Sequence, residues 1–344
     1  MNLELEAALA RALACYPDAP APDPAFERPE FWERASRGGV AALLATSMNR
    51  WTPDLKALAR AQAAMGMRAK AVLAQVLRHC ERAGIAALPI KGPLLGERLY
   101  PEPHLRPTSD IDLLVPAAER DRTVELLTAA GGKPPGSAEH AYYGEHHHHV
   151  NVALNGVLVE IHFRASANFG VFLPSEPLLA RSSAAKVGGI ATRVLEPHDE
   201  LVYLAVHAAA HNLARDVLLL DLRRLDESVR IDPRVLRERA GSFGLERAVG
   251  VAIQASVERC GTRADLLEPA WARESVRLLR RLPRDLPMGD SDDRAEQLRG
   301  FWAHAILAPS PRIAAASAIH DAARIAKRRL HKRWPAIVPE AWSG

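Results

Sequence analysis

The feature that most restricts how this chain can fold is an Asn-Gly pair between two strand-like segments. Residues 147–154 and 157–163 are rich in β-branched and alternating side chains, and Asn155 and Gly156 separate them. A two-residue hairpin turn needs positive φ at both central positions, which asparagine and glycine accept more readily than other residues. The pattern therefore predicts a β-hairpin over these residues.

A two-residue turn also determines which side chains of the hairpin share a face. The expected opposite pairs are Leu154 with Val157, Asn151 with Glu160, and His149 with His162. Because side chains alternate along a strand, the apolar face contains Val150, Val152, Val159 and Ile161. The other face contains His147, His149, Asn151, Leu158, Glu160 and His162. Glu160 is thus predicted on the polar face of a strand whose opposite face is buried.

Two further carboxylates stand at the head of an apolar segment. Asp110 and Asp112 flank Ile111, and the apolar residues 113–115 follow. Residues two apart in a strand lie on one face, so the two carboxylates would repel each other by ~4 kcal/mol in partly buried surroundings. Hard divalent cations with oxygen ligands would balance this charge. The alternative, a loop whose carboxylates face water, fits poorly with Asp112 inside an apolar strand.

Asp110, Asp112 and Glu160 together match a two-metal site for phosphoryl transfer. In such sites one Mg²⁺ stays with a triphosphate, and a second Mg²⁺ lowers the pKa of the attacking hydroxyl. We expect Asp110 and Asp112 to bridge both ions, with Mn²⁺ as a substitute for Mg²⁺. Glu160 would bind the acceptor-side ion and help to take up the proton. These three residues are the predicted metal ligands and catalytic residues.

A set of candidates for phosphate binding lies upstream of the carboxylates. Lys91 and Gly92 follow the short apolar run 85–90 and open a helix. Glycine allows close approach of the backbone, the first turn of a helix favours an anion, and lysine adds a positive charge. Arg106, four residues before Asp110, could clamp phosphate oxygens. Each residue has an ordinary alternative, a turn or a surface position, and only the combination indicates a site.

The remaining pattern predicts an α+β fold with a small mixed sheet and helices on one face. We expect an N-terminal helical region over residues 1–83, an α/β core over 84–196 and a C-terminal helical region over 197–344. Helices are predicted over 1–15, 30–48, 54–83, 94–99 and 117–130, and strands over 85–90 and 111–115. A second strand pair is expected over 184–195, interrupted by Gly188 and Gly189.

Composition indicates a cytoplasmic protein that does not enter a membrane. Among its 344 residues, 48% are apolar and 25% charged, and no apolar stretch approaches the ~18 residues of a membrane span. The three cysteines are far apart and form no C-x-x-C pair, which is typical of reduced thiols. The net charge is only +4, with a basic cluster over 324–333. This cluster could hold a nucleic acid, but a solvated helix face explains it better.

The motifs that carry the candidate residues resemble a known family. Residues 88–115 contain P-I-K-G-P-L-L, L-Y-P and R-P-T-S-D-I-D-L-L-V. They are similar to the K-G-x-x-L … Y-P … R-P-x-S-D-I-D-L-L-V signature of the uncharacterised nucleotidyltransferase family in the DNA polymerase β-like superfamily. A histidine pair (His148, His149) and the V-E-I-H-F segment 159–163 resemble a later block of that family. The resemblance extends over about residues 60–225.

This resemblance implies a polymerase β-like fold, with Asp110 and Asp112 as metal ligands and Glu160 as the third carboxylate. Lys91-Gly92 stands where much of the superfamily has a Gly-Ser pair, so phosphate binding is less firmly implied than metal binding. Ser109, within the signature, joins the phosphate-binding candidates. Some lineages of the superfamily have lost activity, but this chain keeps all three carboxylates.

Several histidines have two readings. His146 to His149, with His162 opposite, would allow a zinc site, but we favour polar residues that shape an acceptor pocket or support the metal ligands. His149, His162 and Asn151 are the candidates for that role. His207 and His211 share a helix face, and Asp221 lies among leucines and should have a partner. A buried network between helices is favoured over a wall that contacts nucleotide or acceptor.

The expected function is transfer of a nucleoside monophosphate from an NTP, such as ATP, to a hydroxyl of an unidentified acceptor, with release of pyrophosphate. The acceptor could be a small molecule, peptide, protein or RNA. One alternative is a catalytically vestigial nucleotide- or RNA-binding regulatory module. Another is a zinc hydrolase that uses the histidine cluster.

Overall fold

The computed structural model describes residues 3–134, 148–283 and 294–316, and these form two compact units. Unit 1 contains the described residues of Met1–Met67, Leu95–Thr108 and Pro197–Leu307. Unit 2 contains those of Arg68–Leu94, Ser109–Glu196 and Ala308–Gly344. The three-region division expected from the sequence stays a prediction. His146, His147 and the basic cluster 324–333 lie outside the described residues.

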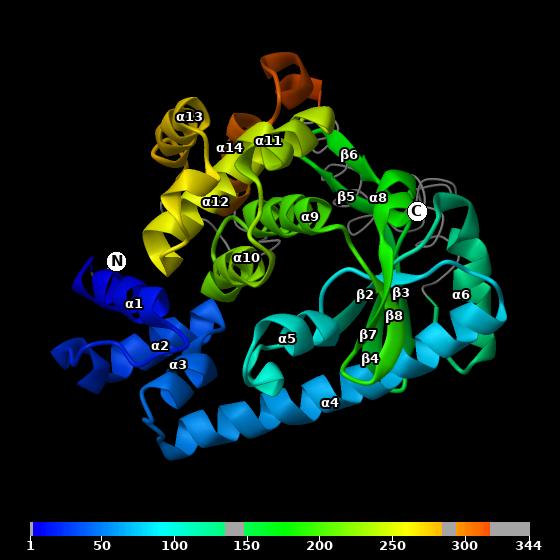
Figure 1. Cartoon of the computed structure of the whole chain (residues 1–344), viewed down its shortest axis with the longest axis horizontal. Helices are drawn as coiled ribbons and strands as arrows, with labels where there is room; N and C mark the ends of the chain where they lie inside the picture. Colours follow the sequence, from blue (N-terminus) through cyan, green and yellow to red (C-terminus); the bar gives the residue numbers. More distant parts are fainter. Residues whose placement is uncertain (1–2, 135–147, 284–293, 317–344) are drawn as a thin grey trace. The chain divides into compact units, whose positions relative to one another are not determined.

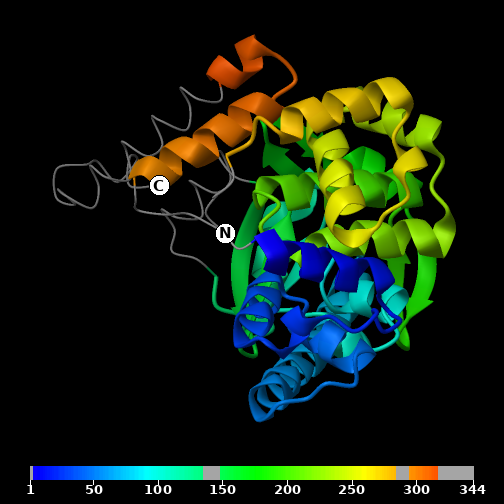
Figure 2. The same cartoon turned by 90° about the vertical axis from the view of Figure 1, so that its left-hand side faces the viewer.

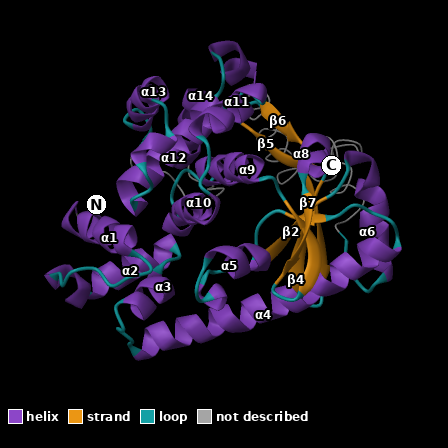
Figure 3. Cartoon of the chain, viewed as in Figure 1, coloured by secondary structure: helices purple, strands orange, loops and turns teal. Residues whose placement is uncertain are grey.

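Unit 2 is built on a mixed sheet with the strand order β1-β2-β4-β3. Figure 3 labels its β2 and β4 strands. Its strands are β1 (Leu88–Pro89), β2 (Asp110–Leu114), β3 (His149–Leu154) and β4 (Val157–His162). β2 and β4 are parallel, whereas β1 pairs with β2 and β3 pairs with β4 in antiparallel fashion. β1 is shorter than the predicted run 85–90, and just after it the Ile90 N–H still donates to the Asp112 carbonyl of β2 at 3.1 Å.

The hairpin predicted from Asn155-Gly156 is confirmed. Both residues have positive φ, 50° at Asn155 and 74° at Gly156. The register is the expected one: Leu154 lies opposite Val157, Asn151 opposite Glu160, and His149 opposite His162. The turn therefore holds Glu160 on the polar face, and the apolar face points into the core.

Two helices cover the apolar face of this sheet. They are α6 (Arg120–Ala129) and the part of α4 (Pro53–Arg82) that belongs to unit 2 (Figure 1). The buried core that they form with the sheet includes Leu73, Val76, Val124, Leu127, Val150, Val152, Ile111, Leu113, Val159 and Ile161. The apolar side chains that alternate along the strands and those on one face of α4 thus pack in the same core.

The rest of unit 2 consists of short elements. The predicted second strand pair is confirmed as β7 (Ser183–Val187) and β8 (Ile190–Val194). Sequence patterns gave no sign of the pair β5 (Arg164–Asn168) and β6 (Val171–Pro174), or of α8 (Ser175–Arg181). These short segments lack a clear period because each buries only a few side chains.

Unit 1 is helical. Its elements are α1 (Leu3–Cys15), η1 (Pro24–Glu27), α2 (Pro29–Gly38), α3 (Ala41–Ser47), the start of α4, most of α5 (Pro93–Leu99), η2 (Pro103–Leu105), α9 (Pro197–Ala210), α10 (Asp216–Val229), α11 (Pro233–Ser242), α12 (Glu246–Cys260), η4 (Ala264–Leu266), α13 (Pro269–Leu279) and α14 (Arg294–Leu307). The single helix expected over 30–48 is divided, because Gly39 adopts a φ of +75° and ends α2. The α9, α10 and α12 helices pack against one another (Figure 2).

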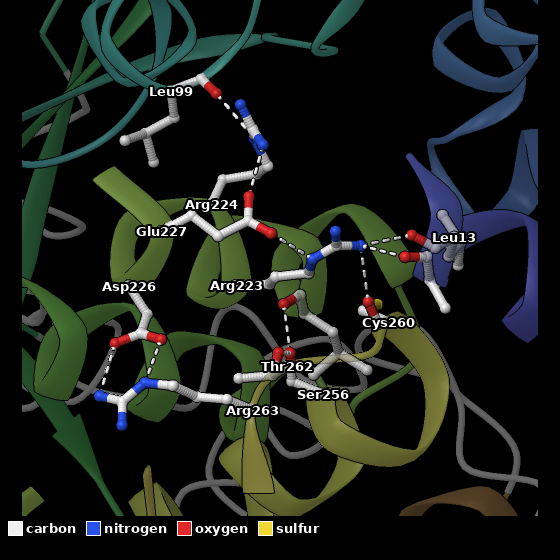
Figure 4. A network of polar contacts seen from close by, with 12 residues as sticks. Leu13, Leu99, Arg223, Arg224, Asp226, Glu227, Ser256, Cys260, Thr262 and Arg263 are labelled. Carbon is white, nitrogen blue, oxygen red and sulfur yellow. Dashed lines mark hydrogen bonds and ion pairs between the residues drawn. The ribbon is translucent and has the colours of Figure 1, made fainter. Parts of the chain in front are cut away.

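An arginine joins three chain segments within unit 1 (Figure 4). The Arg223 guanidinium donates to the backbone carbonyls of Leu13, Ala14 and Cys260, near the C-terminal ends of α1 and α12. Helix C-termini leave carbonyls without intrahelical partners and favour a cation. Arg223 therefore stabilises two helix ends at once.

Within the described residues, none of the helices has both the length and the apolar character required to cross a bilayer.

Candidate metal centre

Two parallel strands bring the predicted carboxylates of unit 2 to the same face of the sheet. Asp112 of β2 lies opposite Glu160 of β4, and Asp110 lies opposite Leu158. Because residues two apart share a face, Asp110 and Asp112 lie on the side of Glu160. The prediction that the polar face of the hairpin looks toward Asp112 is confirmed by this register and by the close approach of the two side chains.

A lysine ammonium occupies the centre of this negative charge. Lys91 Nζ lies 2.9 Å from Asp112 Oδ1, and the lysine also interacts favourably with Asp110 and Glu160. Burial would lower the pKa of Lys91, but the charges of Asp112 and Asp110 raise it above its ordinary value. The Lys91 ammonium thus interacts with all three carboxylates, and a divalent ion at this place would do the same.

His162 adds a second positive group beside the carboxylates. Its Nε2 lies 3.0 Å from Asp112 Oδ1 and 3.3 Å from Glu160 Oε2. Burial would lower the pKa of His162, but the hydrogen bonds with Asp112 and Glu160 raise it. Since ionised carboxylates only accept hydrogen bonds, Nε2 carries the proton and donates to both.

Both carboxylates remain ionised despite their surroundings. Asp112 is fully buried, which would raise its pKa, yet Lys91 and His162 hold that pKa well below its ordinary value. Burial would likewise raise the pKa of Glu160, and the hydrogen bond from His162 lowers it. Two anionic oxygen donors are therefore ready to bind a cation at neutral pH.

The two carboxylates of this cluster supply oxygen ligands that suit a hard divalent ion, and His162 supports them through Nε2. One ligand atom from each of Asp112, Glu160 and His162 lies within 4.8 Å of the other two. Among the described residues, the buried Asp112 Oδ2 and Asn151 Oδ1 have no hydrogen-bond partner. Buried oxygens without partners are costly, and a bound cation with its water shell would satisfy them.

The other phosphate-binding candidates differ in position. Gly92 has a φ of +77°, which requires glycine in the turn after β1, and Ser109 is exposed just before β2. The α5 helix that follows Gly92 has only seven residues and begins at Pro93, which has no N–H. The first N–H of this helix is therefore missing, and phosphate binding at its start stays a prediction.

Arg106 lies in unit 1 and has a different task. Its Nε and Nη2 donate to the two carboxylate oxygens of Asp221 at 2.8 and 2.7 Å, and Tyr100 Oη donates to Asp221 Oδ1 at 2.7 Å. The prediction that Asp221 has a partner is confirmed. This bidentate pair is buried and balances the guanidinium charge within unit 1, and a role of Arg106 in phosphate binding stays a prediction.

His207 and His211 also belong to unit 1. Their rings lie 4.5 Å apart, and the Tyr203 ring stacks on His207 at 6.1 Å. These ring contacts join residues in or just after α9, and both histidines are half-buried. The network between helices and the contact with nucleotide or acceptor both stay predictions.

Comparison with known proteins shows the family of the chain. Residues 24–261 match the family described as uncharacterised nucleotidyltransferase. The chain belongs to this family. None of the curated proteins matches the chain. Membership supports a transferase that acts on a nucleotide, and the matched region extends well beyond the motifs at residues 88–115 and 148–163.

One residue of this nucleotidyltransferase lies close to the centre without having been placed there by strand alternation. His148 precedes β3 and should face away from His149, but its ring packs against His149 and His162. The histidine pair in the family motif indicated His148 as a candidate, but it did not predict which way the His148 side chain points.

Proposed function

We propose that this protein transfers a nucleoside monophosphate from an NTP to a hydroxyl of an acceptor and releases pyrophosphate, with Mg²⁺ as the metal. The observation that carries the proposal is the shared charge of Asp110, Asp112 and Glu160 around the single ammonium of Lys91. Family membership supports the reaction class. The three carboxylates support the metal dependence.

Asp110, Asp112 and Glu160 would hold Mg²⁺, in two ions as in other phosphoryl-transfer sites, with Mn²⁺ able to replace it. When bound, the metal neutralises triphosphate charge and lowers the pKa of the acceptor hydroxyl. Lys91 supplies compensating charge to these carboxylates. With metal held by the carboxylates, the Lys91 ammonium would contact phosphate oxygens.

The reaction itself balances without a further reactant. The acceptor hydroxyl oxygen forms a bond to the α-phosphorus, and the bond from that phosphorus to the α,β-bridging oxygen breaks. Pyrophosphate leaves with the bridging oxygen. The hydroxyl proton passes to the Glu160 carboxylate or through it to water. Asn151 and His149, opposite Glu160 and His162 in the hairpin, are proposed to border the acceptor, while Gly92 and Ser109 border the triphosphate.

Nucleotide binding and turnover test this proposal separately. Thermal unfolding with each NTP and Mg²⁺ should show a higher Tm than with either alone, and the shift should vanish in Asp110→Ala with Asp112→Ala. Pyrophosphate release, with labelled NTP and a host extract as the source of acceptor, should fall at least ~100-fold in Glu160→Gln. Glu125→Gln, an exposed carboxylate on α6, is the matched control and should behave as wild type.

Two outcomes would contradict the proposal. Turnover by Glu160→Gln at the wild-type rate would remove Glu160 from the reaction. An undiminished Tm shift in the double Asp variant would remove the metal centre from nucleotide binding. Nucleotide binding without turnover in any condition would favour the regulatory-module alternative.

A further inference from the structure

Three imidazole rings gather beside the carboxylate cluster of unit 2. The ring centroids of His148, His149 and His162 lie 4.7, 5.3 and 5.1 Å apart. One ring nitrogen from each residue lies within 4.8 Å of the other two. Nitrogen atoms at this spacing can share one metal ion after small rotations of the side chains, because a zinc ion bound by histidines has Zn–N distances of about 2.0–2.1 Å.

The backbone at the start of β3 explains why two consecutive histidines lie on one side. His148 forms a bend before the strand begins at His149. Its carbonyl accepts hydrogen bonds from both Phe163 N–H at 3.0 Å and Arg164 N–H at 3.3 Å, so two residues face one, as in a β-bulge. This irregularity breaks the alternation of a regular strand and turns His148 toward His149 and His162.

His162 presents its two nitrogens to different surroundings. Nε2 donates to Asp112 and Glu160, whereas Nδ1 is buried and, among the described residues, has no hydrogen-bond partner. The whole residue is 2% exposed. A histidine that binds a metal through one nitrogen usually donates the other N–H to a carboxylate, which fixes the ring. His162 already has the carboxylate half of that arrangement.

We propose that His148, His149 and His162 bind one Zn²⁺ ion, through Nδ1 of His162, whose proton passes to solvent on binding, and one nitrogen of each of the other two rings. Imidazole nitrogen suits zinc, whereas Mg²⁺ requires oxygen ligands. The site is therefore distinct from the proposed Mg²⁺ centre and shares only His162 with its surroundings. Three protein ligands leave a fourth position for water or an oxygen of a bound molecule, as in zinc sites that take part in reactions.

The histidine run itself provides the main competing explanation. His146 and His147 precede the pair His148 and His149 in the sequence and lie outside the described residues. Four consecutive histidines could bind zinc among themselves, without His162. Paired variants separate the two explanations: His148→Gln with His149→Gln removes two proposed ligands, and His146→Gln with His147→Gln removes the same number of histidines from the same run.

The experiment is a competition titration of the full-length protein with Zn²⁺ and a chromogenic chelator, after removal of metals. We expect one ion per chain in the wild type and in the 146/147 variant, with equal affinity. The 148/149 variant should bind zinc more than ~100-fold more weakly. Loss of a group that only supports a metal ligand already lowers affinity by ~10- to 100-fold, and this variant loses two of the ligands themselves. Equal weakening in both variants, or no binding by the wild type, would overturn the proposal.

A second measurement does not depend on whether variants fold. In wild-type protein with ¹⁵N-labelled histidine, Zn²⁺ should shift the Nδ1 resonance of His162 while its Nε2 stays protonated. An unchanged Nδ1 resonance at saturating Zn²⁺ would overturn the proposal. A matching titration with Mg²⁺ and NTP should leave the Nδ1 resonance of His162 unchanged. The Nδ1 resonance therefore reports on the zinc site alone, and failure of the zinc site can be distinguished from failure of the nucleotidyl-transfer proposal.

Discussion

Asp112 illustrates how one residue can be charged and buried at once. It has no exposed surface, and isolated burial of a carboxylate costs far more than a domain can sustain. Its Oδ1 is within hydrogen-bond distance of both the Lys91 ammonium and the His162 imidazole. These two cations make the ionised form the stable one. Removal of either cation should therefore change both the stability of the protein and its binding of metal.

Lys91→Met is expected to lower the free energy of unfolding of metal-free protein by ~3 kcal/mol, because it leaves the buried Asp112 with one cation fewer. Mg²⁺ should then raise the Tm of the variant more than that of the wild type, since no ammonium has to leave the carboxylates. Differential scanning fluorimetry with and without Mg²⁺ measures both effects. Lys186→Met, at an exposed position on β7, is the control.

The effect of Lys91→Met should also depend on pH. In the wild type the pKa of Asp112 is held below its ordinary value, so its contribution to stability is complete above about pH 4 and is lost as pH falls further. A protonated Asp112 needs no ammonium, so the stability difference between wild type and variant should be largest near neutral pH and shrink on acidification. A Mg²⁺ response equal to that of the wild type, or a difference that does not change with pH, would contradict this account.

At the scale of the element, the β3–β4 hairpin positions most of the polar side chains in the centre. Its turn sets the register that places Asn151 opposite Glu160 and His149 opposite His162. A slip of one residue would move Glu160 from the polar face into the core. The parallel pairing of β4 with β2 then places Glu160 opposite Asp112. The position of the third carboxylate therefore depends on two residues at the turn.

Gly156→Ala should destabilise the protein by about 1–2 kcal/mol, because an L-residue with a side chain is strained at the φ of +74° found there. A Cβ atom would also lie 3.3 Å from Arg68 Nη1, a flexible group that can move aside, so backbone strain is the main cause. Urea denaturation measures the loss. Asn155→Gly, at a φ of 50°, is the matched control at the neighbouring turn position and should have a smaller effect. Equal stability of Gly156→Ala and wild type would show that the turn tolerates a side chain.

At the scale of the whole molecule, each compact unit is assembled from segments far apart in the sequence. Unit 1 combines N-terminal helices with residues after Pro197, and unit 2 begins within α4. The three cysteines are distributed over both units. Cys15 is exposed and Cys260 is buried in unit 1, and Cys80 is buried in unit 2. Burial raises the pKa of Cys80 to about 11 and that of Cys260 further.

Thiol labelling should therefore report the integrity of each unit. At pH 8 a thiol reagent should modify Cys15 rapidly and the two buried cysteines at least ~100-fold more slowly, because they are protonated and inaccessible. Mass spectrometry of digested protein assigns each site. Cys15→Ser should abolish the fast phase. Fast labelling of Cys80 in folded protein would contradict the packing of unit 2, and fast labelling of Cys260 that of unit 1.

Local patterns in the sequence were sufficient for the hairpin, its register, the pairing of Asp110 and Asp112 on one face, the helices up to residue 130 and the helical character after residue 197. Each of these depends on neighbouring residues: turn preferences, alternation along a strand and helical spacing. The strand pair β5–β6 and the α8 helix were not predicted, because short segments with few buried side chains have no readable period. The division of one predicted helix at Gly39 shows that a single positive φ outweighs a helical pattern.

Only the tertiary structure decided which charges meet. No local rule predicts the ion pair between Lys91 and Asp112 or the one between Arg106 and Asp221. From the sequence alone, Arg106 was a candidate for phosphate binding, and the structure shows that it binds the Asp221 carboxylate. The direction of His148 likewise follows from a bulge formed with Phe163 and Arg164. Contacts between residues far apart in the chain depend on how the strands and helices pack. The sequence determined the elements and their faces, and packing determined the partners of the charged groups.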